Sequence, residues 1–245
     1  MIAPAFALAH IKPDIFEGLS DAEALVAAFD LSFWLRPDQQ IPRTPWRTFG
    51  LQGGRGLGKS LAISFTINDR VERGEAHTIA LMAPTLDRVK DVQVDFIIAT
   101  SPPWFKAREH DGGVLWPNGV EAKPLTPEAP GRSRSGNYDL TWMCEIVDWQ
   151  ASTRWDAFQN LATATRTGRA QIIWDTTSKG KNEVIQHLNA EHRRDPLKNI
   201  IRSGTTFDNP LLSKDYLISI VSQYVKGSRR YEEEIEGKVF AESAG

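Results

Sequence analysis

The feature that most limits how this chain can fold is a glycine-rich loop at residues 53–60 that leads into a helix-forming segment. Glycines tolerate positive φ, so the backbone N–H groups of such a loop can point inward at the positive end of a helix dipole and hold an anion. The loop fits the pattern G-x-x-x-x-G-K-[ST], which binds nucleoside triphosphates: Lys59 would reach the β and γ phosphates, and Ser60 would ligate Mg²⁺. A glycine-rich turn that binds nothing is the alternative. In order, the loop consists of Gly53, Gly54, Arg55, Gly56, Leu57, Gly58, Lys59 and Ser60.

Strand-like and helix-like segments alternate around this loop. Trp46 to Leu51 predicts a strand before it, and Leu61 to Arg73 predicts a helix after it. Thr78 to Ala83 is a continuous apolar run, typical of a buried parallel strand, and residues 85–99 carry apolar positions at helical spacing. This alternation predicts an α/β fold with a mostly parallel sheet flanked by helices. We also expect strands at 138–145 and 170–175, an extended stretch at 199–205, and helices at 153–165, 182–194, 213–224 and 229–236.

Four local patterns lie outside this alternation. Ser20 and Glu23 form a capping box that opens a short helix. The Asn-Gly pair within residues 114–122 predicts a β-hairpin, and the neighbouring proline favours an edge of the sheet. Two prolines predict an extended segment at residues 36–42. Residues 126–136 are rich in Pro, Gly, Ser and Arg, so we expect a loop that is mobile until something orders it.

The composition indicates the cellular compartment of the protein but says little about its function. At 245 residues, with 41% hydrophobic and 24% charged residues, the chain can bury one substantial core. The formal net charge of −2 excludes a uniformly basic protein but allows a local basic surface for nucleic acid. The single cysteine, Cys144, excludes an internal disulfide and fits a reducing compartment. The apolar run from Ile2 to Ala9 is too short to span a membrane and lacks a basic flank, so we expect a cytosolic protein.

An acid ends the predicted strand at 138–145. Glu145 stands where the metal-organising and water-activating acids of P-loop enzymes lie, but the residue before it, usually aspartate, is Cys144. A neutral thiol is a poor partner for a hydrated hard cation. We therefore expect Mg²⁺ to be held mainly by Ser60 and the phosphates, unless another acid such as Asp148 or Asp139 contributes.

Two further sets of polar side chains lie beside the predicted sheet. Thr176, Thr177 and Ser178 follow the strand at 170–175, at the edge where an open α/β sheet binds ligand. The alternative is that they cap a helix beginning near Lys181, and without more context this is the better interpretation. Gln39 offers a donor and an acceptor that suit an adenine edge, although a glutamine in a loop is usually solvated surface.

Taken in order, these segments resemble the ATPase domain of the large terminase subunit, the DNA-packaging motor of tailed bacteriophages. The resemblance spans roughly residues 34 to 240. The matching segments are residues 36–39, like an adenine-binding segment; the arginine-containing phosphate loop 53–60; residues 116–119; residues 134–136 just before Asp139; the strand end 142–145; the hydroxyls 176–178, like a coupling motif; residues 206–210; and residues 234–240.

The resemblance implies a RecA-like (ASCE) P-loop fold in three parts: an N-terminal helical extension at 1–33, the ATPase core at 34–205, and a lid or linker region at 206–245. It implies an ATPase that uses ATP and Mg²⁺ to translocate double-stranded DNA into a procapsid. The implied partners are the portal, the small terminase subunit and further copies of the chain in a ring. We expect a monomer in dilute solution, no membrane association, and a location in the host-cell cytoplasm.

The resemblance also implies residue roles. Arg55 would act on the γ-phosphate of its own subunit, and Arg134 would be an arginine finger acting on a neighbour's nucleotide. Glu145 would orient the attacking water. The coupling residues would be Thr176, Thr177 and Ser178, and the adenine would be read by Gln39.

Two departures from the family pattern keep alternatives open. Cys144 replaces the usual aspartate, which leaves a weakly hydrolysing nucleotide-binding module as one alternative. Full-length relatives continue into an RNase H-like nuclease that has no counterpart in these 245 residues, so we expect a motor fragment rather than a shortened relative. A helicase-like or other P-loop DNA translocase is the remaining alternative.

Overall fold

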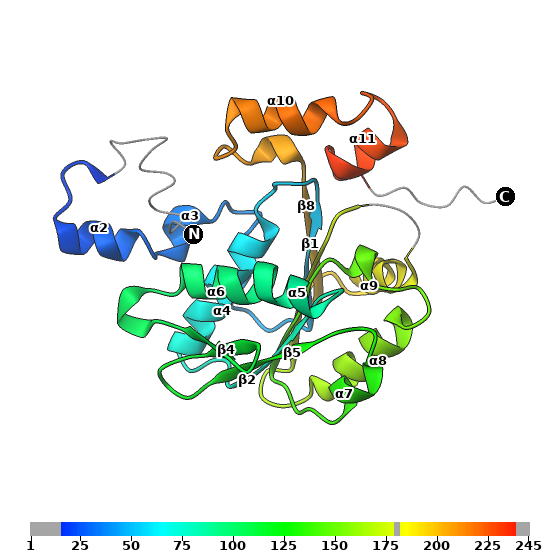
Figure 1. Ribbon diagram of the computed structural model, residues 1–245, viewed down its shortest axis with the longest axis horizontal. Coiled ribbons are helices and arrows are strands. Elements are labelled where there is room, and N and C mark those ends of the chain that lie inside the picture. Colours follow the sequence, from blue (N-terminus) through cyan, green and yellow to red (C-terminus); the bar gives the residue numbers. More distant parts are fainter. Residues whose placement is uncertain (1–15, 179–181, 239–245) are drawn as a thin grey trace.

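The computed structural model describes residues 16–178 and 182–238, and within them the strands form one eight-stranded sheet between layers of helices (Figure 1). The strand order is β3-β4-β5-β2-β6-β7-β1-β8. The strands are β1 (Thr48–Gly53), β2 (Thr78–Met82), β3 (Arg108–His110), β4 (Gly113–Leu115), β5 (Glu121–Leu125), β6 (Leu140–Met143), β7 (Gln171–Thr176) and β8 (Asn199–Gly204).

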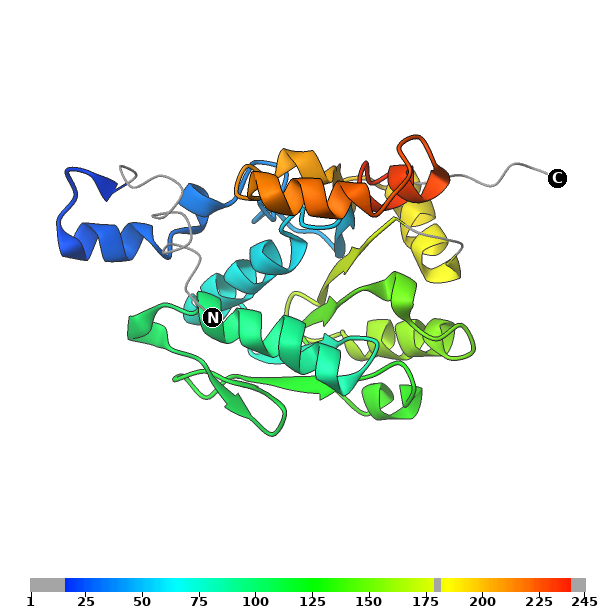
Figure 2. The same ribbon diagram turned by 45° about the horizontal axis from the view of Figure 1, so that its top comes forward.

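Helices occupy both faces of the sheet and its upper edge. In chain order the α-helices are α2 (Asp21–Ala27), α3 (Leu31–Trp34), α4 (Lys59–Glu72), α5 (Leu86–Arg88), α6 (Asp95–Thr100), α7 (Pro130–Arg134), α8 (Arg154–Ala164), α9 (Glu183–Arg194), α10 (Lys214–Ser222) and α11 (Arg229–Glu234). Helix α4 packs in one apolar cluster with α6, and α8 packs in the other with α9. Helices α10 and α11 lie above the carboxyl ends of β1 and β8 (Figures 1 and 2).

The sheet is mostly parallel, as the sequence predicts. Strands β1, β2, β5, β6, β7 and β8 pair in parallel, whereas β3 and β4 pair antiparallel at one edge. Parallel strands buried on both faces must be apolar on both sides, which explains their continuous apolar runs. Because all the parallel strands point the same way, their carboxyl ends meet at one edge, where such sheets bind ligands.

The two faces of the sheet are close-packed around tryptophans. Trp142 and Trp174, on adjacent strands, point to opposite faces, and both are fully buried. Trp174 fills the space beside Gly50 of β1: a Cβ at position 50 would stand 2.2 Å from the Trp174 ring. The glycine therefore makes room for an indole that anchors the face covered by α8 and α9.

Most predicted elements are confirmed, within a few residues at their ends. The hairpin at residues 114–122 is formed by β4 and β5 at the edge side of the sheet. The capping box is present, with Ser20 as N-cap and Glu23 closing it. The helix expected at 85–99 is formed by α5 and α6, joined by a π-helical segment from Val89 to Val94. Strand β3 has no counterpart among the predicted elements.

Two predictions about irregular segments are wrong. Residues 36–40 form a hydrogen-bonded turn rather than an extended segment, because the N–H groups of Gln39 and Gln40 both bond to the carbonyl of Arg36. Residues 130–134 form α7 within the expected loop, since Pro130 starts the helix and α8 packs against it. The run Ile2 to Ala9 and the position Lys181 lie outside the described residues, as do Val239 and Phe240 of the matched C-terminal ending.

The C-terminal helices α10 and α11 lie where the resemblance implies a lid, and we refer to residues 206–238 as the lid region. Gly227, with φ of 80°, separates α10 from α11. Ile220 of α10, Tyr231 of α11 and Ile235 form a separate apolar cluster. Across the described ranges, 16–178 and 182–238, none of the helices has the length and apolar character needed to cross a membrane.

Gly50→Ala should lower the free energy of unfolding by about 1–3 kcal/mol, because the added methyl group overpacks against Trp174 in the buried sheet. Gly131→Ala is the matched control: a Cβ at position 131 meets nothing within 4 Å. Urea denaturation followed by circular dichroism compares the two variants with the parent. Equal stability of Gly50→Ala and Gly131→Ala would contradict this account of the core.

Candidate functional site

The candidate site lies at the carboxyl edge of the sheet, where β1, β7 and β6 stand side by side. The glycine-rich loop connects β1 to α4, so the helix begins at Lys59 directly above that edge. Gly58 is the residue before the helix and has φ of 88°, in the left-handed region that glycine adopts without strain. The loop therefore presents the amino end of a 14-residue helix to the site, which suits an anionic ligand.

Lys59 folds back over the loop that precedes it. The side chain is buried, and its Nζ donates to the carbonyls of Gly53 at 3.1 Å and Gly54 at 3.2 Å. The ammonium group is thus held at the loop by weak, neutral acceptors. A phosphate oxygen is a stronger, charged acceptor for the same group.

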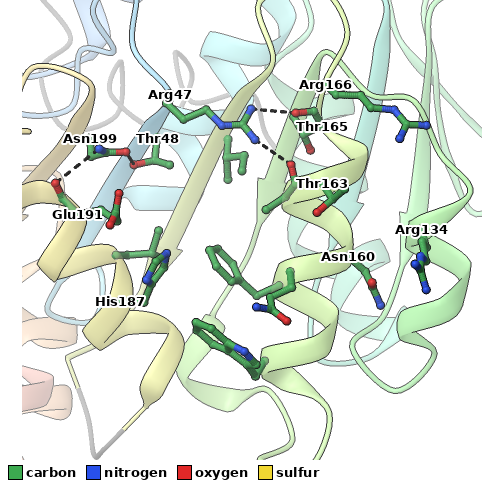
Figure 3. Close-up of a pocket in the computed structure, with 16 residues that line it drawn as sticks. Arg47, Thr48, Arg134, Asn160, Thr163, Thr165, Arg166, His187, Glu191 and Asn199 are labelled. Carbon is green, nitrogen blue, oxygen red and sulfur yellow. Dashed lines mark hydrogen bonds between the residues drawn. The ribbon is translucent and has the colours of Figure 1, made fainter.

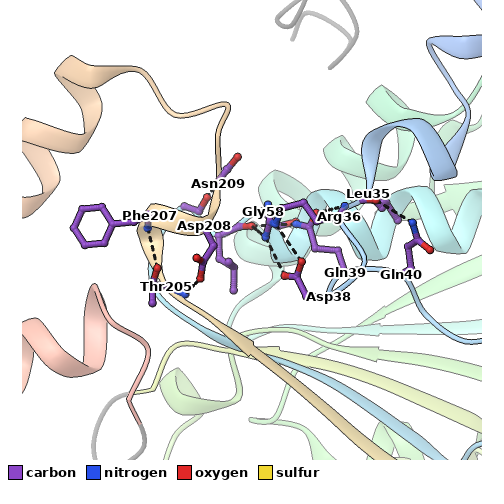
Figure 4. Close-up of polar contacts among 12 residues, drawn as sticks. Leu35, Arg36, Asp38, Gln39, Gln40, Gly58, Thr205, Phe207, Asp208 and Asn209 are labelled. Carbon is purple, nitrogen blue, oxygen red and sulfur yellow. Dashed lines mark hydrogen bonds and ion pairs between the residues drawn. The ribbon is translucent and has the colours of Figure 1, made fainter.

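The turn at residues 36–40 fastens the loop from one side (Figure 4). Gln39 is 4% exposed, and its Nε2 donates to the carbonyls of Leu57 at 3.0 Å and Gly58 at 3.3 Å. Arg36 also donates to the carbonyl of Leu57, and it forms an ion pair with Asp38. Gln39 is therefore not solvated surface, and its amide group supports the loop; its role toward adenine stays a prediction.

The lid region fastens the loop from the other side. Asn209 donates to the carbonyl of Gly56 at 2.6 Å, and the backbone N–H of Arg55 donates to the carbonyl of Glu234. The Arg55 guanidinium forms an ion pair with the Glu234 carboxylate, 2.7 Å from Nε to Oε2, and this bond raises the pKa of Arg55. Gly54 has no room for a side chain, since a Cβ would stand 2.5 Å from the carbonyl oxygen of Ile235. The predicted γ-phosphate arginine is thus paired with a lid carboxylate in this structure.

Glu145 and the hydroxyl residues of the next strand lie together. Glu145 has φ of 45° and ψ of 54°, a left-handed conformation that is uncommon for a residue other than glycine. Its Oε2 accepts hydrogen bonds from the backbone N–H of Thr177 at 3.2 Å and from the Thr177 hydroxyl at 3.4 Å. Thr176 accepts from the N–H of Val147. Each threonine therefore links β7 to the segment that carries the predicted catalytic acid.

Ser178 extends this link to the lid region, because its hydroxyl donates to the carbonyl of Gly237 at 2.9 Å. The alternative capping role for these hydroxyl residues is wrong. The N-cap of α9 is Asn182, whose side chain accepts from the N–H groups of Val184 and Ile185.

Asp175 is a buried carboxylate that the sequence analysis does not single out. It is fully buried and accepts hydrogen bonds from the Trp142 indole N–H at 2.6 Å and from the N–H of Glu145 at 3.4 Å. Burial and the nearby charge of Glu145 raise its pKa to about 7, while the indole bond and the Lys59 ammonium lower it. The net increase means that burial and the Glu145 charge outweigh the indole bond and the Lys59 charge.

Cys144 lies beside Asp175, 3.7 Å from Sγ to Oδ1. Burial, together with the charges of Asp175 and Glu145, raises the pKa of the thiol well above its usual range. Cys144 is therefore a neutral hydrogen-bond donor. Of the other acids considered, Asp139 does not replace it, because it caps the start of β2 through the N–H groups of His77 and Thr78. Asp148 lies at an exposed position of the 3-10 turn after Glu145.

Arg134 lies far from the glycine-rich loop of its own chain. It lines a groove of about 800 Å³ together with the first residues of two strands, Thr48 of β1 and Asn199 of β8 (Figure 3). The loop follows the opposite end of β1, and six residues of strand span roughly 17 Å. Arg134 therefore lies near the amino ends of the parallel strands, whereas Lys59 lies at their carboxyl ends.

The structure thus gathers most of the predicted site at one edge and leaves Arg134 out. The loop residues 53–60, Glu145, Thr177 and Ser178 lie at the carboxyl edge, with Gln39 beside the loop. Sequence reasoning missed Asp175 and Glu234. Asp175 has the feature that identified Glu145, because it is an acid at the end of an apolar strand. Glu234 lies within the acidic run 232–234, a pattern typical of a solvated helix face.

Comparison with known proteins identifies the family and the fold. A sequence model of the family described as terminase large subunit, T4-like-virus type, N-terminal, matches residues 51–245. A search of curated proteins finds no match.

Solved structures share the fold at low identity. The ATPase domain of the large terminase of Thermus phage P74-26 aligns with a TM-score of 0.62 at 15% identity, covering 90% of this chain and 98% of that domain. A large terminase from a thermophilic bacteriophage aligns with a TM-score of 0.62 at 12% identity, covering 87% of this chain and 52% of that one. The chain therefore spans about half the length of that terminase, which has also been solved with ADP and with ATP-γ-S.

Proposed function

Because this chain belongs to the family of large terminase subunits of the T4-like-virus type, we propose that it binds and hydrolyses ATP to drive DNA packaging. The observation that carries the proposal is the placement of Lys59, at the start of α4, on the same sheet edge as Glu145. The charges of both residues act on the buried Asp175, so the cation and the acid share one low-dielectric site. Such a site suits phosphoryl transfer, in which the protein mainly positions groups and neutralises charge.

In the proposed reaction, different residues bind the phosphates, orient the water and contact the adenine. Lys59 exchanges the carbonyls of Gly53 and Gly54 for β and γ phosphate oxygens. Glu145, oriented by Thr177, accepts a hydrogen bond from the attacking water. Gln39 lies beside the loop, where the adenine would lie, and Arg55 reaches the γ-phosphate once it leaves Glu234.

The donor set of this edge fits a magnesium ion that is bound mostly through phosphates. Ser60, the second residue of α4, supplies a hydroxyl, and Asp175 supplies a buried carboxylate. Ser60 would hold Mg²⁺, which supplies charge neutralisation on the β and γ phosphates.

The motor role extends this proposal to partners. We propose that copies of the chain form a ring around double-stranded DNA at the portal of a procapsid, with the small terminase subunit as a further partner, in the host-cell cytoplasm. The division into an extension at 1–33, a core at 34–205 and a lid or linker at 206–245 is likewise a proposal. One solved structure that shares the fold is the DNA-packaging motor of Phi-28, with a TM-score of 0.51.

Lys59→Ala should abolish ATP binding or turnover, whereas Glu145→Ala should retain binding and lose turnover. Losing a direct phosphate or water contact costs several kcal/mol of barrier, or roughly a hundredfold or more in rate. Phosphate release and binding of a fluorescent ATP analogue are measured with and without DNA, with Lys90→Ala, in the π-helical segment between α5 and α6, as a control. ATP hydrolysis at the parent rate by Glu145→Ala would show that another group activates the water.

Replacing Thr176 and Thr177 with valine keeps their shape and removes the hydroxyls that contact the Glu145 segment. We expect a greater loss of DNA-stimulated turnover than of nucleotide affinity, because these bonds connect the Glu145 segment to β7. Thr163→Val, on an exposed position of α8, is the control. If affinity and turnover fall equally, the coupling role is rejected.

Arg134 should act on the nucleotide of a neighbouring subunit, since its own loop lies at the other edge of the sheet. An arginine supplied at the transition state is worth about 10³ to 10⁵ in rate. Mixing Glu145→Ala chains with Arg134→Ala chains under conditions of ring assembly should therefore restore ATPase activity that neither has alone.

Arg132→Ala, on the same helix, is the matched control and should keep its activity unmixed. A mixture that assembles but stays inactive rules out action in trans. In that case a parallel loss of DNA affinity in Arg134→Ala would assign the residue to the DNA backbone instead.

A further inference from the structure

We propose that Asp175, one strand away, takes the place of the carboxylate that position 144 lacks: it accepts a hydrogen bond from water bound to Mg²⁺ and fixes the backbone of Glu145. This inference rests on the proposed function. It concerns a positioning residue, since Asp175 acts through the cation's water and through Glu145.

The register of the sheet places Asp175 level with Cys144 and on the face of the sheet that α4 covers. Asp175 pairs with Leu51 of β1, and the preceding residue, Trp174, pairs with Met143 of β6. Asp175 is therefore flanked by Leu51 and Cys144. Neighbouring residues at one level of a parallel sheet point to the same face. Leu51 and Cys144 both belong to the apolar cluster under α4, so Asp175 also faces the helix that begins with Lys59.

The strand order puts Asp175 nearer to the phosphate loop than Cys144 is. Strand β7 lies directly between β1, which leads into the loop, and β6, which carries Cys144. Adjacent strands are about 4.8 Å apart, so the Asp175 carboxylate lies one strand spacing closer to the phosphate loop than a carboxylate at position 144 would. The Lys59 charge acts on Asp175 from there.

The hydrogen bonds of Asp175 leave room for one more donor. Its donors among the described residues are the Trp142 indole, the N–H of Glu145 and the Cys144 thiol. An ionised carboxylate has roughly four acceptor positions. The remaining position suits a water molecule of a hydrated divalent cation.

Cys144 then has a definite part in the arrangement. A second carboxylate at position 144 would stand beside Asp175 in a buried site, and two like charges at that distance disfavour each other. A thiol donates to Asp175 instead, at 3.7 Å. Cys144 is thus a neutral hydrogen-bond donor beside the Asp175 carboxylate, where a second acid would be repelled.

The test is a magnesium titration of nucleotide binding, which needs no turnover. Binding of a fluorescent non-hydrolysable ATP analogue is followed as Mg²⁺ is added to the parent, Asp175→Asn, Cys144→Asp, and the double variant. Asparagine keeps an acceptor for the Trp142 indole. Binding in EDTA checks that each variant retains its fold.

We expect Asp175→Asn to need at least 10-fold more Mg²⁺ for half-maximal binding, the usual effect of losing an outer partner of a metal ion. Cys144→Asp alone should not lower the requirement, because the role is already filled and a second carboxylate beside the buried Asp175 is disfavoured. The double variant, with the carboxylate returned to β6, should regain most of the loss. If Asp175 had a purely structural role, a carboxylate at position 144 would not lower the Mg²⁺ requirement of Asp175→Asn.

Asp148→Asn removes an acid from the segment after Glu145 and should leave the titration unaltered. A requirement of Asp175→Asn within about twofold of the parent would overturn the inference, as would a double variant no better than Asp175→Asn. If the parent itself binds no nucleotide in the presence of Mg²⁺, the proposed function fails, which is distinguishable from failure of the Asp175 assignment alone.

Discussion

The position of β7 between β1 and β6 is the constraint on which the rest of the site depends. Parallel pairing on both sides of this strand fixes the level at which three chain segments end. It sets Asp175 beside Cys144 and Thr177 beside Glu145, although these partners are 31 and 32 residues apart in sequence. A shift of one residue in either register would turn the Asp175 carboxylate to the other face of the sheet.

Burial makes this arrangement sensitive to charge. Asp175 and Cys144 are no more than 1% exposed, and Lys59 is 7% exposed, so their interactions are weakly screened by solvent. In the described structure the cationic groups are occupied by the protein itself: Lys59 by loop carbonyls and Arg55 by Glu234. Nucleotide binding as we propose it replaces these internal contacts with phosphate, which couples ligand binding to the position of the lid region.

The loop is also held by segments distant from it in sequence. The turn at 36–40 bonds to the carbonyls of Leu57 and Gly58, while Asn209 and Glu234 bond to Gly56 and Arg55 from the C-terminal side. Buried backbone groups in a loop without regular structure need such partners. The same contacts make the lid sensitive to changes of the loop, and Ser178 adds a path from the β7 hydroxyls to Gly237.

The amino-acid sequence by itself determined the parts of this protein whose chemistry is local. Glycines before Lys59, an apolar run ending in Glu145, the Ser20–Glu23 capping box and the Asn-Gly hairpin each depend on neighbours within a few residues, and the structure contains the loop, strand, cap and hairpin in those places. Only the tertiary structure decided which carboxylate stands beside Cys144, that Glu234 of an acidic helix is paired with Arg55, and that Arg134 lies at the far edge. Those facts depend on strand order and on contacts between segments as much as 179 residues apart, and no local propensity encodes them.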